Sequence, residues 1–336
     1  MNSFVEKTID VIGFSNPMQD LLVELDRLPR SNQNLAMREY CFQGGGNVPT
    51  ALVTCGMLGM KAAMLGVVGD DIFGYANLAD FAYNHVDTSH VIMDPGTRTD
   101  FCIAVTERAI EGKEFISKRG TCREIELEDL DEDFLRATRI MHIGYTNPVV
   151  LRACEIVRAA GGKISIDAAY YRPDIYQHYD ILDIFIASET YYNTMQREMG
   201  VEMSRAETCR YIRERGPEIV IFTFGTQGCF GVYGKDQYFE TPAFTVETVD
   251  STGAGDVFHG AFNYGYLKGW TVPEIARFCS ACSAIKCTRQ GGRAGIPTLG
   301  NVLRFLETGE IDTAEIDRRE SHYKHGFFGQ DVGGKR

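Results

Sequence analysis

The sequence lacks any apolar run of about 20 residues, the length that a membrane-spanning helix needs. Its start contains Glu6, Lys7 and Asp10 and no apolar segment like that of a secretory signal peptide. Positive charge is also scarce, because 34 Lys and Arg oppose 46 Asp and Glu, for a net charge of −12. A protein that binds duplex nucleic acid usually has a basic face. We therefore expect a cytoplasmic protein that binds neither a membrane nor a nucleic acid.

Metal-ligand and dinucleotide motifs are missing as well. Three of the ten cysteines, Cys279, Cys282 and Cys287, are close in sequence. They fall on a helical pattern without a nearby histidine, so they do not provide the converging ligands of a zinc site, and we expect free thiols in a reducing compartment. The pattern Gly-x-Gly-x-x-Gly does not follow the first expected strand, where residues 13–16 are Gly-Phe-Ser-Asn. This argues against an NAD-binding oxidoreductase.

Short apolar segments alternate with helical patterns along most of the chain. The expected strands are residues 8–14, 62–68, 139–143, 163–166, 181–187 and 219–224, and the expected helices are residues 48–58, 77–84, 148–160, 205–215, 254–268 and 272–288. Short strands rich in Val and Ile are typical of a buried parallel sheet. The alternation predicts an α/β fold, with a Rossmann-like, mainly parallel sheet flanked by helices on both faces.

Two segments, residues 16–42 and 98–117, interrupt this alternation with extended, alternating patterns, and the second contains an expected hairpin. No helical pattern is available to cover these strands. We interpret them as a small β-sheet that stands off the main domain, and edge strands of the main sheet are the alternative. The α/β core then comprises residues 1–15, 43–97 and 118–320. Residues 321–336, with their glycine-rich end, are expected to form a loosely ordered tail.

One segment combines features that suit phosphate chemistry. Residues 245–256 are typical of a strand, a tight turn and the start of a helix, and the turn is formed by Gly253, Ala254 and Gly255. Such small residues let a ligand approach the backbone, and the first N–H groups of a helix attract anions. Asp256 follows directly. A base beside an anion site suits phosphoryl transfer, although aspartate is also a common residue at a helix N-terminus.

This segment resembles the C-terminal signature of the ribokinase-like, or PfkB, carbohydrate kinases. The resemblance is carried in family order by residues 45–74 with their paired glycines, residues 249–262 around the Gly-Ala-Gly-Asp turn, and residues 288–298. It implies a ribokinase-like fold with a small β-sheet lid, and ATP-dependent phosphorylation of a hydroxyl of a small sugar or sugar derivative, with Mg²⁺. Some relatives also hold a monovalent cation, K⁺, beside the anion site, and that question stays open for this chain.

The resemblance also implies roles for individual residues. Asp256 becomes the catalytic base and Gly253–Gly255 the anion hole, while Asp20, Gly45 and Gly46 bind the sugar. The expected nucleotide-binding residues are Thr223, Gly225, Gly228, Thr252, Gly253 and Gly255. The small sheet corresponds to the family's lid, which excludes water and, in several relatives, pairs with a second lid to form a homodimer.

Two positions depart from the family pattern. Thr50 stands where the family has an asparagine that binds sugar hydroxyls, so we expect a substrate contact from a shorter side chain. The family's Asn-x-x-Glu segment, which orders water around Mg²⁺, is replaced by Ser-Glu-Thr-Tyr at residues 188–191, and Glu189 is the candidate for the metal role. Arg172 is a further candidate for a contact with substrate or phosphate.

The sequence therefore favours a sugar kinase but leaves two alternatives open. A nucleoside kinase of the same fold would need an aromatic pocket for a base. Tyr40, Phe42, Phe101 and Tyr145 could line such a pocket, or could simply pack the lid. The departures at Thr50 and in residues 188–191 also leave open a non-catalytic relative that binds a sugar.

Overall fold

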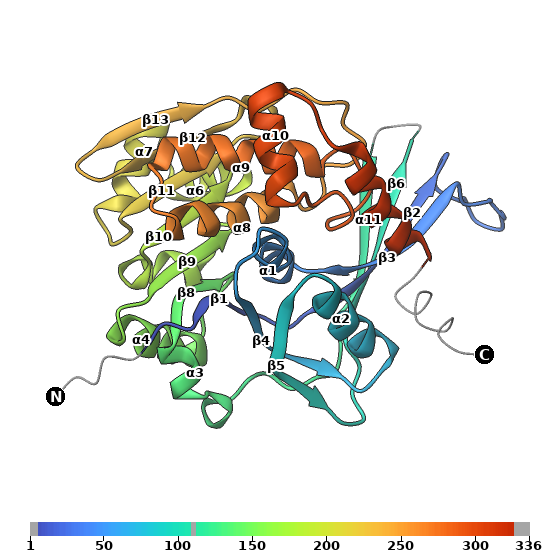
Figure 1. The fold of residues 1–336 in the computed structure, drawn as a ribbon, viewed down its shortest axis with the longest axis horizontal. Helices are drawn as coiled ribbons and strands as arrows, with labels where there is room; N and C mark the ends of the chain where they lie inside the picture. Colours follow the sequence, from blue (N-terminus) through green and yellow to red (C-terminus); the bar gives the residue numbers. More distant parts are fainter. Residues whose placement is uncertain (1–5, 109–111, 326–336) are drawn as a thin grey trace.

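The computed structural model of the chain describes residues 6–108 and 112–325 (Figure 1). In these residues, the main sheet has nine strands in the order β13-β12-β11-β10-β9-β8-β1-β4-β5. Its strands are β1 (Ile9–Phe14), β4 (Ala62–Gly69), β5 (Val86–Asp94), β8 (Thr138–Ile143), β9 (Lys163–Ala168), β10 (Ile184–Ser188), β11 (Ile219–Thr223), β12 (Cys229–Tyr233) and β13 (Gln237–Thr241). The strands from β5 to β11 are parallel, and only β12 and β13 run antiparallel to their neighbours. The expected α/β fold with a mainly parallel sheet is confirmed.

Helices cover both faces of this sheet. One layer contains α1 (Asn47–Met57), α2 (Ile72–Tyr83), α8 (Ala254–Leu267), α9 (Val272–Lys286) and α10 (Leu299–Thr308). The other contains α3 (Glu132–Arg136), α4 (Pro148–Ala159), α5 (Pro173–Tyr176), α6 (Glu189–Met199) and α7 (Arg205–Arg213). Successive strand residues point to opposite faces, so that Ile140 joins the first core cluster and Met141 the second. Burial on both faces explains why the central strands are apolar throughout.

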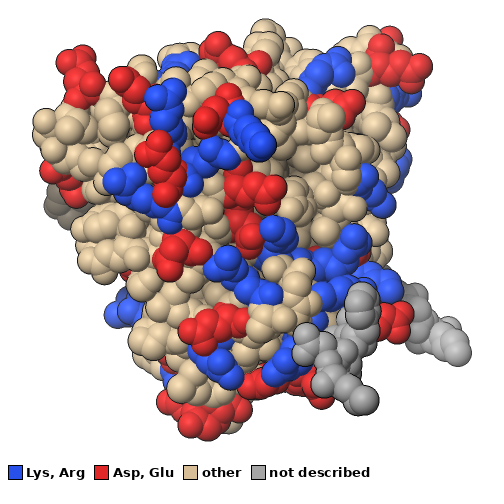
Figure 2. All heavy atoms as spheres, turned by 90° about the vertical axis from the view of Figure 1, so that its left-hand side faces the viewer, with Lys and Arg blue, Asp and Glu red and all other residues tan. Residues whose placement is uncertain are grey.

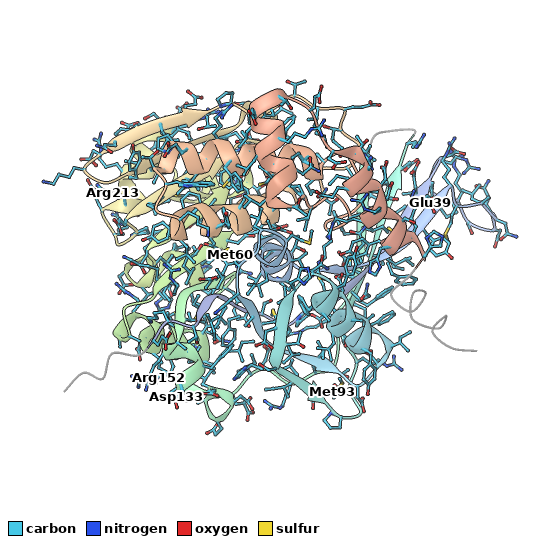
Figure 3. The ribbon with its side chains drawn as sticks, in the orientation of Figure 1. Glu39, Met60, Met93, Asp133, Arg152 and Arg213 are labelled. Atoms are coloured by element: carbon cyan, nitrogen blue, oxygen red, sulfur yellow. The ribbon has the colours of Figure 1, made fainter. Side chains whose placement is uncertain are left out.

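The first core cluster connects the helices that carry the site to the sheet. It includes Met60, which lies among packed side chains in the middle of Figure 3, whereas Arg152 points to solvent at the lower edge of the same view. The core positions the start of α8 at the carboxyl ends of the parallel strands. Ligands of open α/β sheets bind at that end.

The four-stranded second sheet projects from the main domain, on the right in Figure 1. Its order is β3 (Glu39–Gly45), β2 (Met18–Leu25), β6 (Asp100–Glu107) and β7 (Gly112–Lys118). The expected small sheet is therefore separate, and the alternative of edge strands of the main sheet is wrong. One boundary differs: residues 43–45, assigned to the core, continue β3, because they pair with the first residues of β2.

The expected tail from residue 321 is wrong for its first five residues. Helix α11 (Thr313–His325) continues through them, because Tyr323 is buried and its hydroxyl donates a hydrogen bond to Asp80 Oδ1 at 2.8 Å. Residues 326–336 lie outside the described part of the chain. The ten cysteines carry free thiols, as expected.

The surface carries both signs of charge. On the face in Figure 2, Lys and Arg side chains are interspersed with Asp and Glu side chains over short distances. None of the helices in residues 6–108 and 112–325 is both long and apolar enough to cross a membrane.

Candidate active site

The turn before α8 requires glycine at one position and leaves space at another. Gly253 has a φ of 75°, and a Cβ atom there would lie 2.8 Å from the Cα atom of Gly292, so both the conformation and the close approach require glycine. A Cβ atom at Gly255 would meet no heavy atom within 4 Å. The backbone at the start of α8 is therefore accessible to a ligand, at the positive end of the helix dipole.

Asp250 and Lys286 hold this turn from behind. The Asp250 carboxylate accepts hydrogen bonds from the backbone N–H groups of Thr252 and Gly291, each at 2.8 Å. The ammonium group of Lys286, which is fully buried, donates to the Asp250 carbonyl oxygen at 2.7 Å. These bonds join the turn to the end of α9 and to the segment that follows it.

Asp256 lies in the first turn of α8 and is partly buried. Burial and, secondly, the negative charge of Asp167 raise the pKa of Asp256 to about 7, against the lowering influence of His259, Lys286 and Arg293. A carboxylate with a pKa close to the working pH can accept a proton and release it again, as a general base must.

A buried histidine and a buried aspartate lie next to Asp256. The Nε2 atom of His259, on α8, is 3.2 Å from Oδ1 of Asp167, at the end of β9. Burial acts to raise the pKa of Asp167, but the charge and hydrogen bond of His259 outweigh it and hold that pKa below its usual range. Burial and the proximity of His259 lower the pKa of His142, on β8, to about 3.

Four of the six expected nucleotide residues border one cleft of about 340 Å³. Thr223, Gly225 and Gly228 line it from the end of β11, and Ala254 and Gly255 line it from the start of α8. Further lining residues are Thr226, Ala243, Phe244, Val246, Thr248, Ser251, Phe258, Ser280, Ser283, Ala284 and Cys287. Thr252 and Gly253 connect the lining residues Ser251 and Ala254 in the chain. The predicted nucleotide set is thus brought together, with additional contributions from α9.

On the side of the small sheet, Asp20 lies against the paired glycines. A Cβ atom at Gly45 would overlap the Asp20 carboxylate, so glycine is required for this approach. Gly46, with a φ of 89°, precedes α1. Burial raises the pKa of Asp20 to about 6, and the positive charge of Arg293 opposes this. The structure therefore brings Asp20, Gly45 and Gly46 together, and their binding of a sugar stays a prediction.

Arg293 is a site residue that the sequence analysis did not single out. It is fully buried and forms an ion pair with Asp80 on α2. It also donates hydrogen bonds to the Gly45 carbonyl oxygen at 3.1 Å and to the Thr50 hydroxyl at 3.4 Å. Thr50 is only 2% exposed. The short Thr50 side chain is thus buried against Arg293, and its contact with the substrate stays a prediction.

The family model for the pfkB family carbohydrate kinases matches residues 8–299 of the chain. The chain belongs to this family. It is 29% identical over 289 residues to fructokinase-1 of Zea mays, a match that covers 78% of the chain and 88% of that protein. It is 25% identical over 311 residues to ribokinase of Haemophilus influenzae, covering 90% and 99%. Ribokinase of Arabidopsis thaliana, solved in complex with ribose and ATP, aligns with a TM-score of 0.76 at 18% identity, covering 88% of the chain and 98% of that structure.

Membership of the pfkB family confirms the resemblance and the predicted enzyme class. This pfkB kinase is a phosphotransferase with an alcohol group as acceptor. The fold of the solved ribokinase agrees with the observed main sheet and small second sheet.

Residues 188–191, which depart from the family pattern, form the start of α6. Ser188 caps α6, where its Oγ accepts a hydrogen bond from the Tyr191 N–H at 3.2 Å, and the Tyr191 side chain is buried. Glu189 is exposed on the first turn and lines neither the nucleotide cleft nor the polar cleft described below. In residues 6–108 and 112–325, no three His, Cys, Asp or Glu side chains converge as metal ligands. The metal role of Glu189 stays a prediction.

Arg172 borders a second, more polar cleft of about 610 Å³. Asn16, Tyr145 and Arg172 follow β1, β8 and β9, and Arg119 follows β7 of the small sheet. Arg172 donates hydrogen bonds to the Gly144 carbonyl oxygen at 3.2 Å and to the Asp174 carboxylate at 3.1 Å. This pfkB kinase thus has a polar cleft between its main domain and its small sheet.

Proposed function

We propose that this kinase transfers the γ-phosphoryl group of ATP to a hydroxyl of a small sugar or sugar derivative, with Asp256 as the base. The observation that carries the proposal is the position of Asp256, with its raised pKa of about 7, directly after a glycine turn that borders a cleft. An anion site and a base on one helix turn are what phosphoryl transfer to an alcohol needs.

In the proposed reaction, the substrate hydroxyl donates its proton to the Asp256 carboxylate. The hydroxyl oxygen forms a bond to the γ-phosphorus while the bond from that phosphorus to the bridging oxygen breaks, and ADP leaves with the bond's electron pair. The backbone N–H groups at Gly253–Gly255 stabilise the negative charge of the group in transfer. Asp256 later releases the proton to water, which its raised pKa allows.

The sugar would bind between the glycines and the small sheet. Asp20 is a hydrogen-bond acceptor for sugar hydroxyls, and its partial burial strengthens such bonds. The polar cleft around Arg172 and Asn16 offers further donors and acceptors. The small sheet would act as a lid that excludes water from the reaction. The named sugars of the relatives, fructose and ribose, support this substrate class.

A magnesium ion would be held chiefly by the phosphates of ATP and by water, because the described residues offer no cluster of metal ligands. When bound, it would neutralise charge on the phosphates. The nucleotide itself fits the residues present, since the cleft is bordered by Gly225, Gly228 and Gly255, whose small size lets phosphates approach the backbone.

The test is ADP release in Mg²⁺ and K⁺ buffers, with D-fructose, D-ribose, sugar acids and adenosine offered separately. We expect release with a sugar or sugar acid, and a loss of about 10²–10⁴ in kcat for Asp256→Asn. Near-normal turnover of Asp256→Asn would refute the base. Turnover of adenosine alone would assign a nucleoside kinase, and sugar binding without ADP release would assign a non-catalytic relative.

A further inference from the structure

A cluster of buried polar side chains lies behind Asp256, and the proposed reaction assigns it no role. We name it the histidine cluster: Asp167 on β9, His142 on β8 and His259 on α8. The His259 and Asp167 side chains are 5% and 7% exposed and 3.2 Å apart, and the ring centres of His142 and His259 are 5.4 Å apart. Its position between α8 and the sheet places it inside a core of apolar side chains.

Hydrogen bonding alone does not explain why the fold keeps this cluster. In the described part of the chain, the buried atoms His142 Nε2 and His259 Nδ1 have no hydrogen-bond partner. Unpaired polar atoms in a core lower stability, so apolar residues would pack these positions with less cost. A polar cluster that is retained at a structural cost, directly beside a reactive group, points to a role in the reaction.

The spacing on α8 connects the cluster to the base. His259 follows Asp256 by three residues, which places both on the same face of the helix. The charged groups that act on Asp256 come from each surrounding element: Asp167 from β9, Lys286 from α9 and Arg293 from the segment after α9. Asn47, at the start of α1, hydrogen-bonds to Asp167 and is neutral.

The geometry points to His259 as a positioning residue for the base: as an imidazolium paired with Asp167, it balances the Asp167 charge and favours the ionised form of Asp256. This inference rests on the proposed role of Asp256. Without the cation, the negative charge of Asp167 would act on Asp256 without compensation, and like charges in a partly buried site resist ionising together.

His142 is the matched control within the cluster. Burial lowers its pKa to about 3, so it is neutral at neutral pH and contributes packing without charge. If the charge of His259 matters, replacing His259 and replacing His142 by glutamine must have different effects on Asp256. If only packing matters, the effects are alike.

The first measurement uses the unmodified kinase with ¹⁵N-labelled histidine. We expect the NMR signals of His259, assigned by their loss in His259→Gln, to show protons on both ring nitrogens at pH 7. A neutral ring at pH 7 would overturn the inference. If His259→Gln does not fold, the conservative His259→Asn provides the same assignment.

The second measurement is an NMR titration of the Asp256 carboxyl carbon in protein with ¹³C-labelled aspartate, assigned with Asp256→Asn. We expect His259→Gln to raise the midpoint by about 1 pH unit or more. His142→Gln should leave the midpoint in place. The double variant Asp167→Asn/His259→Gln removes both charges. It should return the Asp256 midpoint towards the midpoint of the unmodified kinase. An unchanged midpoint in His259→Gln, or an equal shift in His142→Gln, would overturn the inference.

Kinetics separate this inference from the proposed function. The pH profile of kcat is measured with the sugar that gives ADP release. In His259→Gln, its acid limb should shift to higher pH by the same interval as the Asp256 midpoint, and turnover should recover at about pH 9. Asp256→Asn should stay inactive at every pH. Activity of Asp256→Asn would refute the proposed base itself, whereas an inactive Asp256→Asn with an unshifted His259→Gln profile would refute only the role of His259.

Discussion

At the scale of single residues, the site depends on where the backbone tolerates a side chain. Gly253 and Gly255 are two residues apart in one turn, yet a Cβ atom at Gly253 would meet Gly292 and one at Gly255 would meet no neighbouring atom. The first glycine serves the fold and the second serves access to the cleft. Residue identity alone cannot distinguish the two roles, because both are glycines of one motif.

This difference predicts opposite effects of alanine at the two glycines. Gly253→Ala should lower the free energy of unfolding by more than about 1 kcal/mol, because its φ of 75° is strained for alanine. Gly255→Ala should leave stability unchanged but raise KM for ATP about tenfold, equivalent to about 1.4 kcal/mol, because its methyl group would enter the cleft. Urea unfolding and ADP-release kinetics measure the two effects. A stable Gly253→Ala, or a Gly255→Ala with normal KM, would contradict this account.

At the scale of elements, α2, β3 and α11 meet at one buried carboxylate. Asp80 pairs with Arg293 and accepts hydrogen bonds from the Tyr323 hydroxyl and from the Asn84 amide, each at 2.8 Å. Arg293 in turn donates to Gly45 at the end of β3. Helix α11 is therefore joined to Gly45 through the side chains of Asp80 and Arg293.

Removing the charge at Asp80 should weaken this junction strongly. In Asp80→Asn the Arg293 guanidinium stays buried without its counter-charge, so the free energy of unfolding should fall by about 3–5 kcal/mol. The matched control is Glu155→Gln, which breaks an exposed pair with Arg152 and should cost less than about 1 kcal/mol. Urea denaturation measures both variants. A loss for Asp80→Asn as small as that of the control would show that Arg293 does not depend on its partner.

Strands and helices could be predicted from the sequence where burial leaves a clear pattern of apolar residues. The central strands are apolar because both faces are covered, and the small sheet could be recognised from its alternation. Strand β5 was not predicted, because it is the edge strand and half of its residues are polar. Helix α6 was not predicted either, because only Tyr191 and Met195 of its residues are buried.

In the candidate site, too, the sequence predicts only what a local pattern displays, and contacts between residues far apart in the chain are missed. Asp256, its glycine turn and Asp20 lie in short motifs that the sequence displays. Arg293 and Asp80 are 213 residues apart, and His259 and Asp167 are 92 apart by their numbers, so no local pattern connects them. Such pairs become visible only when the strands and helices are placed together.

At the scale of the whole molecule, buried titratable groups connect the site to the stability of the fold. Burial raises the pKa of Asp256 to about 7, above its unfolded value of about 4, so the folded protein binds the extra proton between these values. This contribution makes the free energy of unfolding fall as the pH rises through that window. His142 acts in the opposite sense, because its folded pKa of about 3 lies below its unfolded value of about 6.5, and its contribution is lost as the pH falls.

Because these contributions oppose each other, the total free energy of unfolding does not separate them. The difference in this free energy between one variant and the unmodified kinase, followed as a function of pH, does. Asp256→Asn has a neutral side chain at every pH and avoids the cost of an ionised carboxylate in the partly buried site. Its stability relative to the unmodified kinase should therefore increase between about pH 5 and pH 8, by on the order of 1–3 kcal/mol. Urea unfolding without ligands, repeated across this pH range for both proteins, measures this difference. If the Asp256→Asn difference does not vary with pH, the carboxylate titrates as an exposed one and the site does not hold it for catalysis.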